Sequence, residues 1–267
     1  MPLATRHRSF PHKRESKGAK LWAPACAGRN GVSCLLLFLF LSLMPAFALA
    51  QSCPAPLNGA RRLVLVTAES MTTTQAALQL FERAAPDATW RALGEAEPAL
   101  IGKAGMAWAH AFRALALAGE PVKVDGDKRV PAGVYRIGRP FGLSASRRPG
   151  YLHLTPGTVC VDDPASPDYN TITARARVGW KVHGENMWRV PEYRHGLLVD
   201  YPTNARAKAG SCIFIHVRLP EAWGTSGCVA LPEERVKALQ DFAEAGAVLA
   251  VLPRAALGRL AGCLPVN

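Results

Sequence analysis

The sequence predicts a mainly β fold with two or three short helices, in one domain that follows an N-terminal leader. Short runs rich in β-branched and aliphatic residues recur along the chain, and turns containing Gly or Pro separate them. Few of these runs alternate with long helical patterns, which argues against a parallel α/β sheet. The chain has 267 residues, of which 49% are hydrophobic, and this is enough to form a buried core.

Residues 1–50 carry the features of an export signal. Seven Lys and Arg residues precede an apolar run at 35–44, and Ala48-Leu49-Ala50 supplies the small-x-small pattern of a cleavage site. The run is short for a membrane span. We therefore expect 1–50 to be a signal peptide, or alternatively an uncleaved N-terminal anchor. Residues 51–267 are then the exported domain, with a core at about 60–253.

The net charge of the chain is +12, from 32 Lys and Arg against 20 Asp and Glu. The leader contains seven of the basic residues and one Glu, so the rest keeps 25 basic and 19 acidic residues, a net charge of +6. An exported, modestly basic domain without a dense Lys/Arg stripe is not expected to bind nucleic acid. Its charge suits an anionic polymer outside the cytoplasm, or is ordinary surface charge that maintains solubility.

The N-terminal half of the domain is expected to combine strands with one short helix. Residues 61–69 form an apolar, β-branched run that predicts a strand. Residues 72–83 are interpreted as an amphipathic helix, because Leu78, Phe81 and Ala85 recur at helical spacing.

Further strands are expected along the middle of the chain. We predict strands at 89–96, bounded by Pro98, and at 130–137, which follows a Gly-Asp turn. The segments 151–161 and 196–200 have the same character.

The C-terminal part is expected to hold one helix and a last strand. Pro232 suits a first helical position, and Glu233 and Glu234 suit the positive N-terminal end of the helix dipole. Gly246 is expected to end this helix, and 247–252 is an apolar run that predicts a strand.

The segment 213–218 carries the first candidate catalytic residue. Its odd positions are β-branched and its even positions are Phe214, His216 and Arg218, which is the period-two pattern of a strand. This pattern places His216 on the face opposite the isoleucines, beside Phe214 and Arg218.

A second candidate, Cys228, follows in the sequence Thr225-Ser226-Gly227-Cys228. Gly227 permits a tight turn and a close approach of substrate, and a loop of this length can bring Cys228 back to His216. A thiol needs a base or an ion-pair partner to be a good nucleophile near neutral pH. The dipole of the following helix would help to hold a thiolate. The alternative is a buried structural cysteine and a structural histidine.

Cysteine counting also points to Cys228. Two of the seven cysteines lie in the leader, which leaves an odd number, and in an oxidising compartment this indicates one free thiol. The other four allow three pairings, or four free thiols. Of these alternatives we expect Cys53 to pair with Cys263, which would tie the termini, and Cys160 to pair with Cys212.

No metal or cofactor is expected, because the sequence has neither an HExxH motif nor a His-x-His pair. Asp162-Asp163 is either a pair of carboxylates for acid–base work or, as we favour, part of a solvated turn with Pro164. His183 is a candidate ligand or substrate contact. Tyr193 is interpreted as a packing residue, and the alternative is that it lines a peptide-binding groove.

Several blocks in the same order resemble the YkuD-type L,D-transpeptidases. His216 followed by Thr225, Gly227, Cys228 and Val229 resembles the signature of this family. The block GDKRVPAGVYRI at 126–137 resembles its strand–turn–strand motif, and the blocks at 160–170 and 185–193 resemble a subgroup of small exported bacterial members. The resemblance covers about 60–253. Ser226 and Ala230 depart from it, since many members have His and Arg there, and the interval from His to Cys is shorter than in much of the family.

The resemblance implies an L,D-transpeptidase-like β-sandwich with a cysteine acyltransferase site. Cys228 would be the nucleophile, His216 its general base or ion-pair partner, held by a backbone carbonyl, and Gly227 part of the oxyanion site. Thr225 and Ser226 are candidates either for positioning the loop or for donating to substrate. Arg218, from its place on the strand face, is a candidate for binding a substrate carboxylate, with a solvated arginine as the favoured alternative.

The implied substrate is the stem tetrapeptide of peptidoglycan, and the implied location is the periplasm or cell wall. Membrane contact is expected only if the leader is retained. An L,D-carboxypeptidase or amidase on the same scaffold, and a non-catalytic peptidoglycan-binding protein, are the alternatives.

Overall fold

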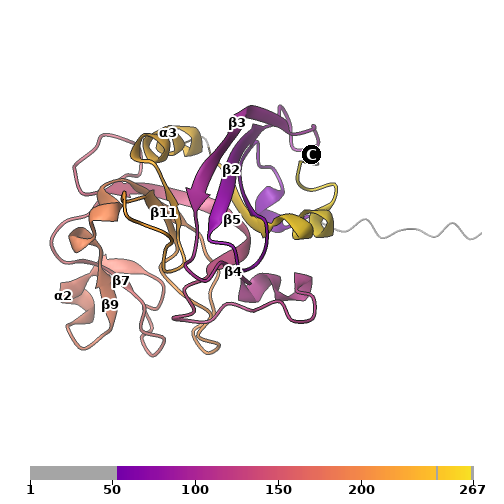
Figure 1. Ribbon diagram of the computed structural model, residues 1–267. Helices are drawn as coiled ribbons and strands as arrows, with labels where there is room; N and C mark the ends of the chain where they lie inside the picture. Colours follow the sequence, from indigo (N-terminus) through magenta and orange to yellow (C-terminus); the bar gives the residue numbers. More distant parts are fainter. Residues whose placement is uncertain (1–52, 245, 266–267) are drawn as a thin grey trace, which may run out of the picture. The chain divides into compact units, whose positions relative to one another are not determined.

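The computed structural model describes residues 53–244 and 246–265, which form a mainly β domain (Figure 1). The signal peptide or anchor expected at 1–50 lies outside the described residues. Within the described part, no helix is both long and apolar enough to cross a membrane.

Short strands make up most of the domain. The strands are β1 (Arg62–Ala68), β2 (Gln75–Glu82), β3 (Arg91–Leu100), β4 (Met106–Trp108), β5 (Val130–Gly142), β6 (Leu152–His153), β7 (Thr158–Val161), β8 (Ile172–Ala174), β9 (Gly184–Asn186), β10 (Gly196–Val199), β11 (Phe214–Val217), β12 (Val229–Leu231) and β13 (Val248–Pro253). The helices are α2 (Arg175–Val178), α3 (Glu233–Ala243) and the 3-10 helices η1 (Ala55–Leu57), η2 (His110–Leu115), η3 (Met187–Arg189), η4 (Pro191–Arg194) and η5 (Arg254–Leu260).

The main sheet is mixed and closes on itself. Its order is β10-β11-β12-β3-β2-β1-β13-β5-β4, with β6 also beside β5, and β10 pairs with β5 to complete the ring. Strands β7, β8 and β9 form a separate small sheet, which lies with α2 away from β2 and β3 in Figure 1. The expected sheet-rich fold with few short helices is therefore confirmed.

Strand β11 separates two hydrophobic clusters. Ile213, Ile215 and Val217 pack into the main core inside the closed sheet. Phe214, on the other face, packs into a second cluster. The members of this second cluster are Phe141, Leu154, Cys160, Met187, Tyr193, Phe214 and Cys228. The alternation predicted for 213–218 is thus confirmed, and both faces of the strand are buried.

The helix expected at 72–83 is wrong, because this segment contains strand β2. It pairs with β1 in regular register, with Val66 opposite Leu78 and Leu63 opposite Phe81. Positions 78 and 81 fall on opposite faces of a regular strand, and both are buried. Burial on both faces removes the period-two alternation, so the apolar positions imitate helical spacing.

Strand β3 begins at Arg91 and continues through Pro98, so the expected boundary is also wrong. Pro98 pairs with Ala77 of β2, while β12 pairs with β3 only at Leu100. Pro98 therefore has a neighbouring strand on one side only, and its missing N–H costs no second ladder bond.

The other predicted strands are present with small changes. Strands β1, β10 and β13 match the expected segments, and β5 runs further than expected, to Gly142. The segment 151–161 divides into the short strands β6 and β7. Helix α3 has Pro232 as its N-cap, one position before the expected place.

Both expected disulfides are present, and Cys228 is the free cysteine of the described residues. The Cys53–Cys263 bridge joins the N-terminal segment to the segment after η5, across a sequence separation of 210. A cross-link over so long a loop strongly restricts the unfolded chain.

Replacing Cys53 and Cys263 together by Ser is predicted to lower the free energy of unfolding by about 2–4 kcal/mol, because the unfolded chain gains freedom. Urea unfolding followed by tryptophan fluorescence measures this change. An unchanged urea midpoint would contradict the prediction. As a control, the rate at which thiol reagents modify Cys228 should not change, because the Cys53–Cys263 bridge lies outside the hydrophobic cluster around Cys228.

Candidate active site

Strand pairing brings Cys228 and His216 to the same face of the sheet. Strands β11 and β12 are parallel, with Ile215 opposite Val229 and His216 opposite Ala230. Cys228 precedes β12 directly, so it lies beside Phe214. Because every second residue of a strand shares a face, the side chains of Cys228 and His216 point the same way.

The thiol of Cys228 is buried and held by two backbone groups. The Phe214 N–H donates to Sγ at 3.4 Å, and Sγ lies 3.6 Å from the carbonyl oxygen of Cys212, to which a protonated thiol donates. Burial raises the pKa of Cys228 to about 12, although the Phe214 amide acts in the opposite direction. The thiol is therefore protonated near neutral pH in the free protein.

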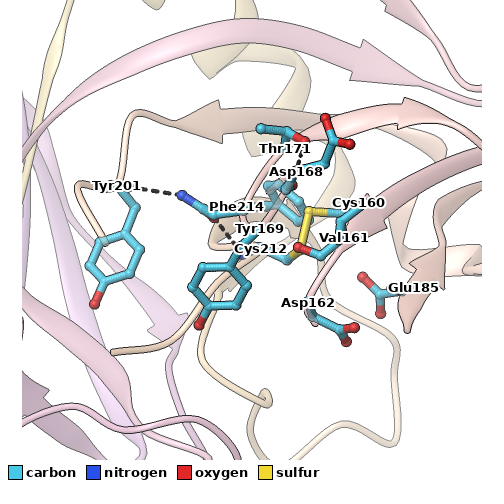
Figure 2. Close-up of a disulfide and its surroundings, with 12 residues drawn as sticks. Cys160, Val161, Asp162, Asp168, Tyr169, Thr171, Glu185, Tyr201, Cys212 and Phe214 are labelled. Atoms are coloured by element: carbon cyan, nitrogen blue, oxygen red, sulfur yellow. Dashed lines mark hydrogen bonds between the residues drawn. A yellow bond between two sulfur atoms is a disulfide. The ribbon is translucent and has the colours of Figure 1, made fainter. Parts of the chain in front are cut away.

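The Cys160–Cys212 disulfide, shown with its surroundings in Figure 2, includes the residue whose carbonyl oxygen faces this thiol. Cys212 has a left-handed backbone, with φ of 56°, and its N–H donates to Oδ1 of Asn170 at 2.9 Å. The disulfide and this hydrogen bond together position the Cys212 carbonyl against Sγ of Cys228.

The imidazole of His216 has a defined tautomer. Its Nδ1 lies 2.9 Å from the carbonyl oxygen of Val217, which can only accept, so Nδ1 carries the hydrogen and Nε2 keeps its lone pair. Burial lowers the pKa of His216, although this carbonyl raises it. The ring of Tyr193 packs edge-on against the imidazole, with 5.5 Å between centroids. His216 is thus a neutral base oriented by a backbone carbonyl.

The two residues share a hollow without direct contact. Both line a cavity of about 170 Å³, yet among the described residues no hydrogen bond joins Sγ of Cys228 to the His216 ring. Hydrogen bonds of a catalytic pair are often long before substrate binds. The pKa directions describe a neutral thiol beside a neutral imidazole rather than an ion pair.

The loop before Cys228 is closed by the side chain of Thr225. Its Oγ1 donates to the Cys228 carbonyl at 2.7 Å and accepts the Gly227 N–H at 3.1 Å. Gly227 has φ of +146°, and a Cβ there would lie 3.2 Å from the carbonyl oxygen of Arg129. The Gly227 N–H is therefore already bonded in the free protein, and a part in the oxyanion site would require it to leave the Thr225 hydroxyl.

Two hollows meet at Cys228. The larger, of about 440 Å³, is lined by charged residues that include Lys123, Asp125 and Asp162, whereas the smaller contains His216 and Arg218. The residues that line both hollows are Glu185, Tyr193, Ser226 and Cys228. A substrate at the thiol would therefore extend into either space.

The remaining predicted residues have distinct positions. Ser226 is exposed between the hollows, and Arg218 is half-buried in the smaller one. The expected help from the helix dipole is not supported, because β12 and Pro232 lie between Cys228 and α3, whereas the dipole acts within the first turn of a helix.

The acids at 162 and 163 belong to a turn, as favoured. Asp163 accepts the N–H of Ala165 at 2.9 Å, while Asp162 pairs with His183. Among the described residues, no three His, Cys, Asp or Glu side chains gather as a metal site.

Glu185 is a residue of the site that the sequence did not reveal, and its only signal was the block at 185–193. It lies on β9, and the hydroxyl of Tyr193 from η4 donates to its Oε2 at 2.7 Å. Tyr193 both packs in the second cluster and lines the two hollows, so it takes both of the roles considered for it.

The model of the YkuD family, the L,D-transpeptidase catalytic domain, matches residues 72–251. The chain belongs to this family. The match includes both candidate catalytic residues and lies within the core expected at about 60–253. L,D-transpeptidase domains act on peptidoglycan, and the sheet-rich fold agrees with membership. No curated protein and no solved structure matches the chain.

Replacing Thr225 by Val is predicted to destabilise the domain by roughly 1–3 kcal/mol, because the Gly227 N–H and the Cys228 carbonyl lose a buried partner. Chemical denaturation measures the loss. Thr225→Ser keeps the hydroxyl and serves as the matched control, and equal stability of the two variants would show that the hydroxyl does not hold this loop.

Alkylation of Cys228 by iodoacetamide is predicted to be slow at pH 7 and to rise about tenfold per pH unit to about pH 10, because the thiol pKa lies near 12. Intact-mass spectrometry follows the reaction with the disulfides kept oxidised. Cys228→Ala should take up no label. A plateau near pH 8.5, the behaviour of an ordinary thiol, would contradict the prediction.

Proposed function

We propose that this domain is a peptidoglycan L,D-transpeptidase that forms a thioacyl-enzyme at Cys228 with stem tetrapeptides. The observation that carries the proposal is the single free thiol of the described residues, which shares one strand face and one hollow with the neutral base His216. With an export signal at 1–50, the reaction would remodel the cell wall in the periplasm.

Acylation begins with proton transfer from the Cys228 thiol to Nε2 of His216. Sγ attacks the carbonyl carbon that joins the L-centre of the diamino acid to the terminal D-Ala. The C–N bond then breaks, His216 returns the proton to the leaving amine, and D-Ala departs. The tripeptide remains as a thioester on Cys228.

Deacylation uses the same base. The amine of a second stem attacks the thioester carbon and gives a proton to His216, which returns it to the departing Sγ. A new amide cross-links the stems and the free thiol is restored. If water attacks in place of the amine, the products are the tripeptide and the thiol, and the enzyme is an L,D-carboxypeptidase.

The negative oxygen of the tetrahedral intermediate requires donors other than the Gly227 N–H, which Thr225 holds. We assign this role to the Cys228 N–H and the exposed Ser226 hydroxyl, since both residues line the two hollows that meet at the thiol. Thr225 acts by fixing the loop. Arg218, which forms no salt bridge among the described residues, is assigned to a substrate carboxylate.

Incubation of the purified protein with a disaccharide-tetrapeptide is predicted to add the mass of the acyl tripeptide to the protein, with release of D-Ala. Intact-mass spectrometry of the protein and chromatography of the muropeptides measure both. Cys228→Ala should form no adduct and no product, because it lacks the nucleophile.

The products distinguish the candidate functions. Cross-linked dimers identify a transpeptidase, and tripeptide alone identifies a hydrolase. Binding without any adduct or product would contradict the catalytic proposal and leave a peptidoglycan-binding protein. Turnover by Cys228→Ala would show that the nucleophile is wrongly assigned.

A further inference from the structure

Glu185 is a carboxylate in the wall between the two hollows that meet at Cys228. It lies on β9, is half-buried, and lines both spaces. Figure 2 shows it beside Asp162, near the Cys160–Cys212 disulfide. The mechanism of acyl transfer by Cys228 and His216 gives this residue no task.

Only one of the two carboxylate oxygens of Glu185 is used within the domain. Oε2 accepts a hydrogen bond from the Tyr193 hydroxyl at 2.7 Å. Among the described residues, Oε1 has no hydrogen-bond partner and no Lys, Arg or His forms a salt bridge with Glu185. Oε1 is also accessible to solvent. Among the described residues, the only side-chain nitrogen or oxygen that is both fully buried and without a hydrogen-bond partner is Nε of Arg175, so the unpartnered Oε1 is not fully buried.

The other acidic groups of the larger hollow, and Lys123, already have partners, whereas Lys208 also lines this hollow and forms no salt bridge among the described residues. Asp162 pairs with His183, and Asp125 accepts the Tyr169 hydroxyl at 2.9 and 2.8 Å with its two oxygens. Lys123 binds Asp127 at 2.5 Å. Glu185 therefore differs from these neighbours in having an oxygen that is available to a ligand.

The negative charge of Glu185 is unfavourable where it lies. Burial raises the pKa of Glu185, and its charge in turn contributes to the raised pKa of Cys228. A cation bound at Oε1 would stabilise the carboxylate and remove a charge that opposes formation of the thiolate. The chemistry of the position thus favours a cationic ligand.

We propose that Glu185 binds the primary ammonium group on the side chain of the diamino acid in a stem peptide. Such a side chain carries its ammonium several bonds from the reacting carbonyl, so a peptide bound at Cys228 can place it in the adjoining space. The inference rests on the proposed function. Two sources share this chemistry, namely the donor stem during acylation and the acceptor stem during cross-linking.

The test compares Glu185→Gln with the unchanged protein on two tetrapeptides that differ in one charge. The first carries lysine at the third position and the second carries norleucine. Without an acceptor, the rate of adduct formation on Cys228 is measured by intact-mass spectrometry. If the donor ammonium binds Glu185, the variant acylates roughly 10- to 100-fold more slowly with the lysine peptide. With the norleucine peptide it is not slowed, because loss of the Glu185 charge only favours the thiolate.

The acceptor arm uses the norleucine peptide as donor and a lysine-containing stem peptide as acceptor. If the acceptor ammonium is the ligand, acylation by Glu185→Gln is not slowed, while its ratio of cross-linked to hydrolysed product falls roughly tenfold or more. Equal rates and equal product ratios for both proteins, with every peptide, would overturn the proposal.

Two controls separate binding from folding. Glu95→Gln removes an exposed carboxylate that forms no salt bridge among the described residues, and should change neither rate nor ratio. Thermal unfolding should show Glu185→Gln to be as stable as the unchanged protein, since Gln retains an oxygen that can accept from Tyr193.

A binding measurement separates this inference from the proposed function. Calorimetric titration of the lysine tetrapeptide into Cys228→Ala, and into the same variant with Glu185→Gln, requires no turnover. A loss of affinity of roughly tenfold or more that is absent for the norleucine peptide supports the Glu185 site even if no adduct ever forms. Equal affinities, with no slower acylation and no lower ratio of cross-linked product in the variant, would refute the site while leaving the catalytic proposal intact.

Discussion

The parallel pairing of β11 with β12 is the constraint on which the candidate active site depends. It places Cys228 beside Phe214 and on the same face as His216, although a loop separates the two residues in sequence. The pairing is held from both sides, because Ile215 anchors β11 in the main core and Phe214 anchors it in the second cluster. A shift of this strand by one residue would move Ile215 out of the main core and turn His216 into it, which the packing opposes.

The backbone around the thiol is held by covalent and polar contacts as well as by packing. The disulfide to Cys160 and the bond from Asn170 fix Cys212, whose carbonyl oxygen faces Sγ of Cys228. On the other side, the Thr225 hydroxyl closes the loop that precedes the nucleophile. These contacts orient the site before substrate arrives, which reduces the entropy lost on reaching the reactive geometry.

The electrostatics of the free site favour an unreactive state. Burial keeps the Cys228 thiol protonated and the His216 imidazole neutral, and Glu185 adds negative charge near the thiol. A buried thiolate without a neighbouring cation would be costly. A substrate that brings positive charge to this space would reverse the balance, so that the thiol would become reactive only when the correct peptide is bound.

The sequence by itself determined the features that depend on local pattern and composition. These are the alternation at 213–218, the odd cysteine count, and the order of blocks that marks the L,D-transpeptidase family. Only the tertiary structure decided that β2 is a strand, because burial on both faces removed its period. It also decided that Glu185 and Tyr193 border the thiol and that Thr225 holds the Gly227 N–H. Such contacts join segments that closure of the sheet brings together, and no local pattern encodes them.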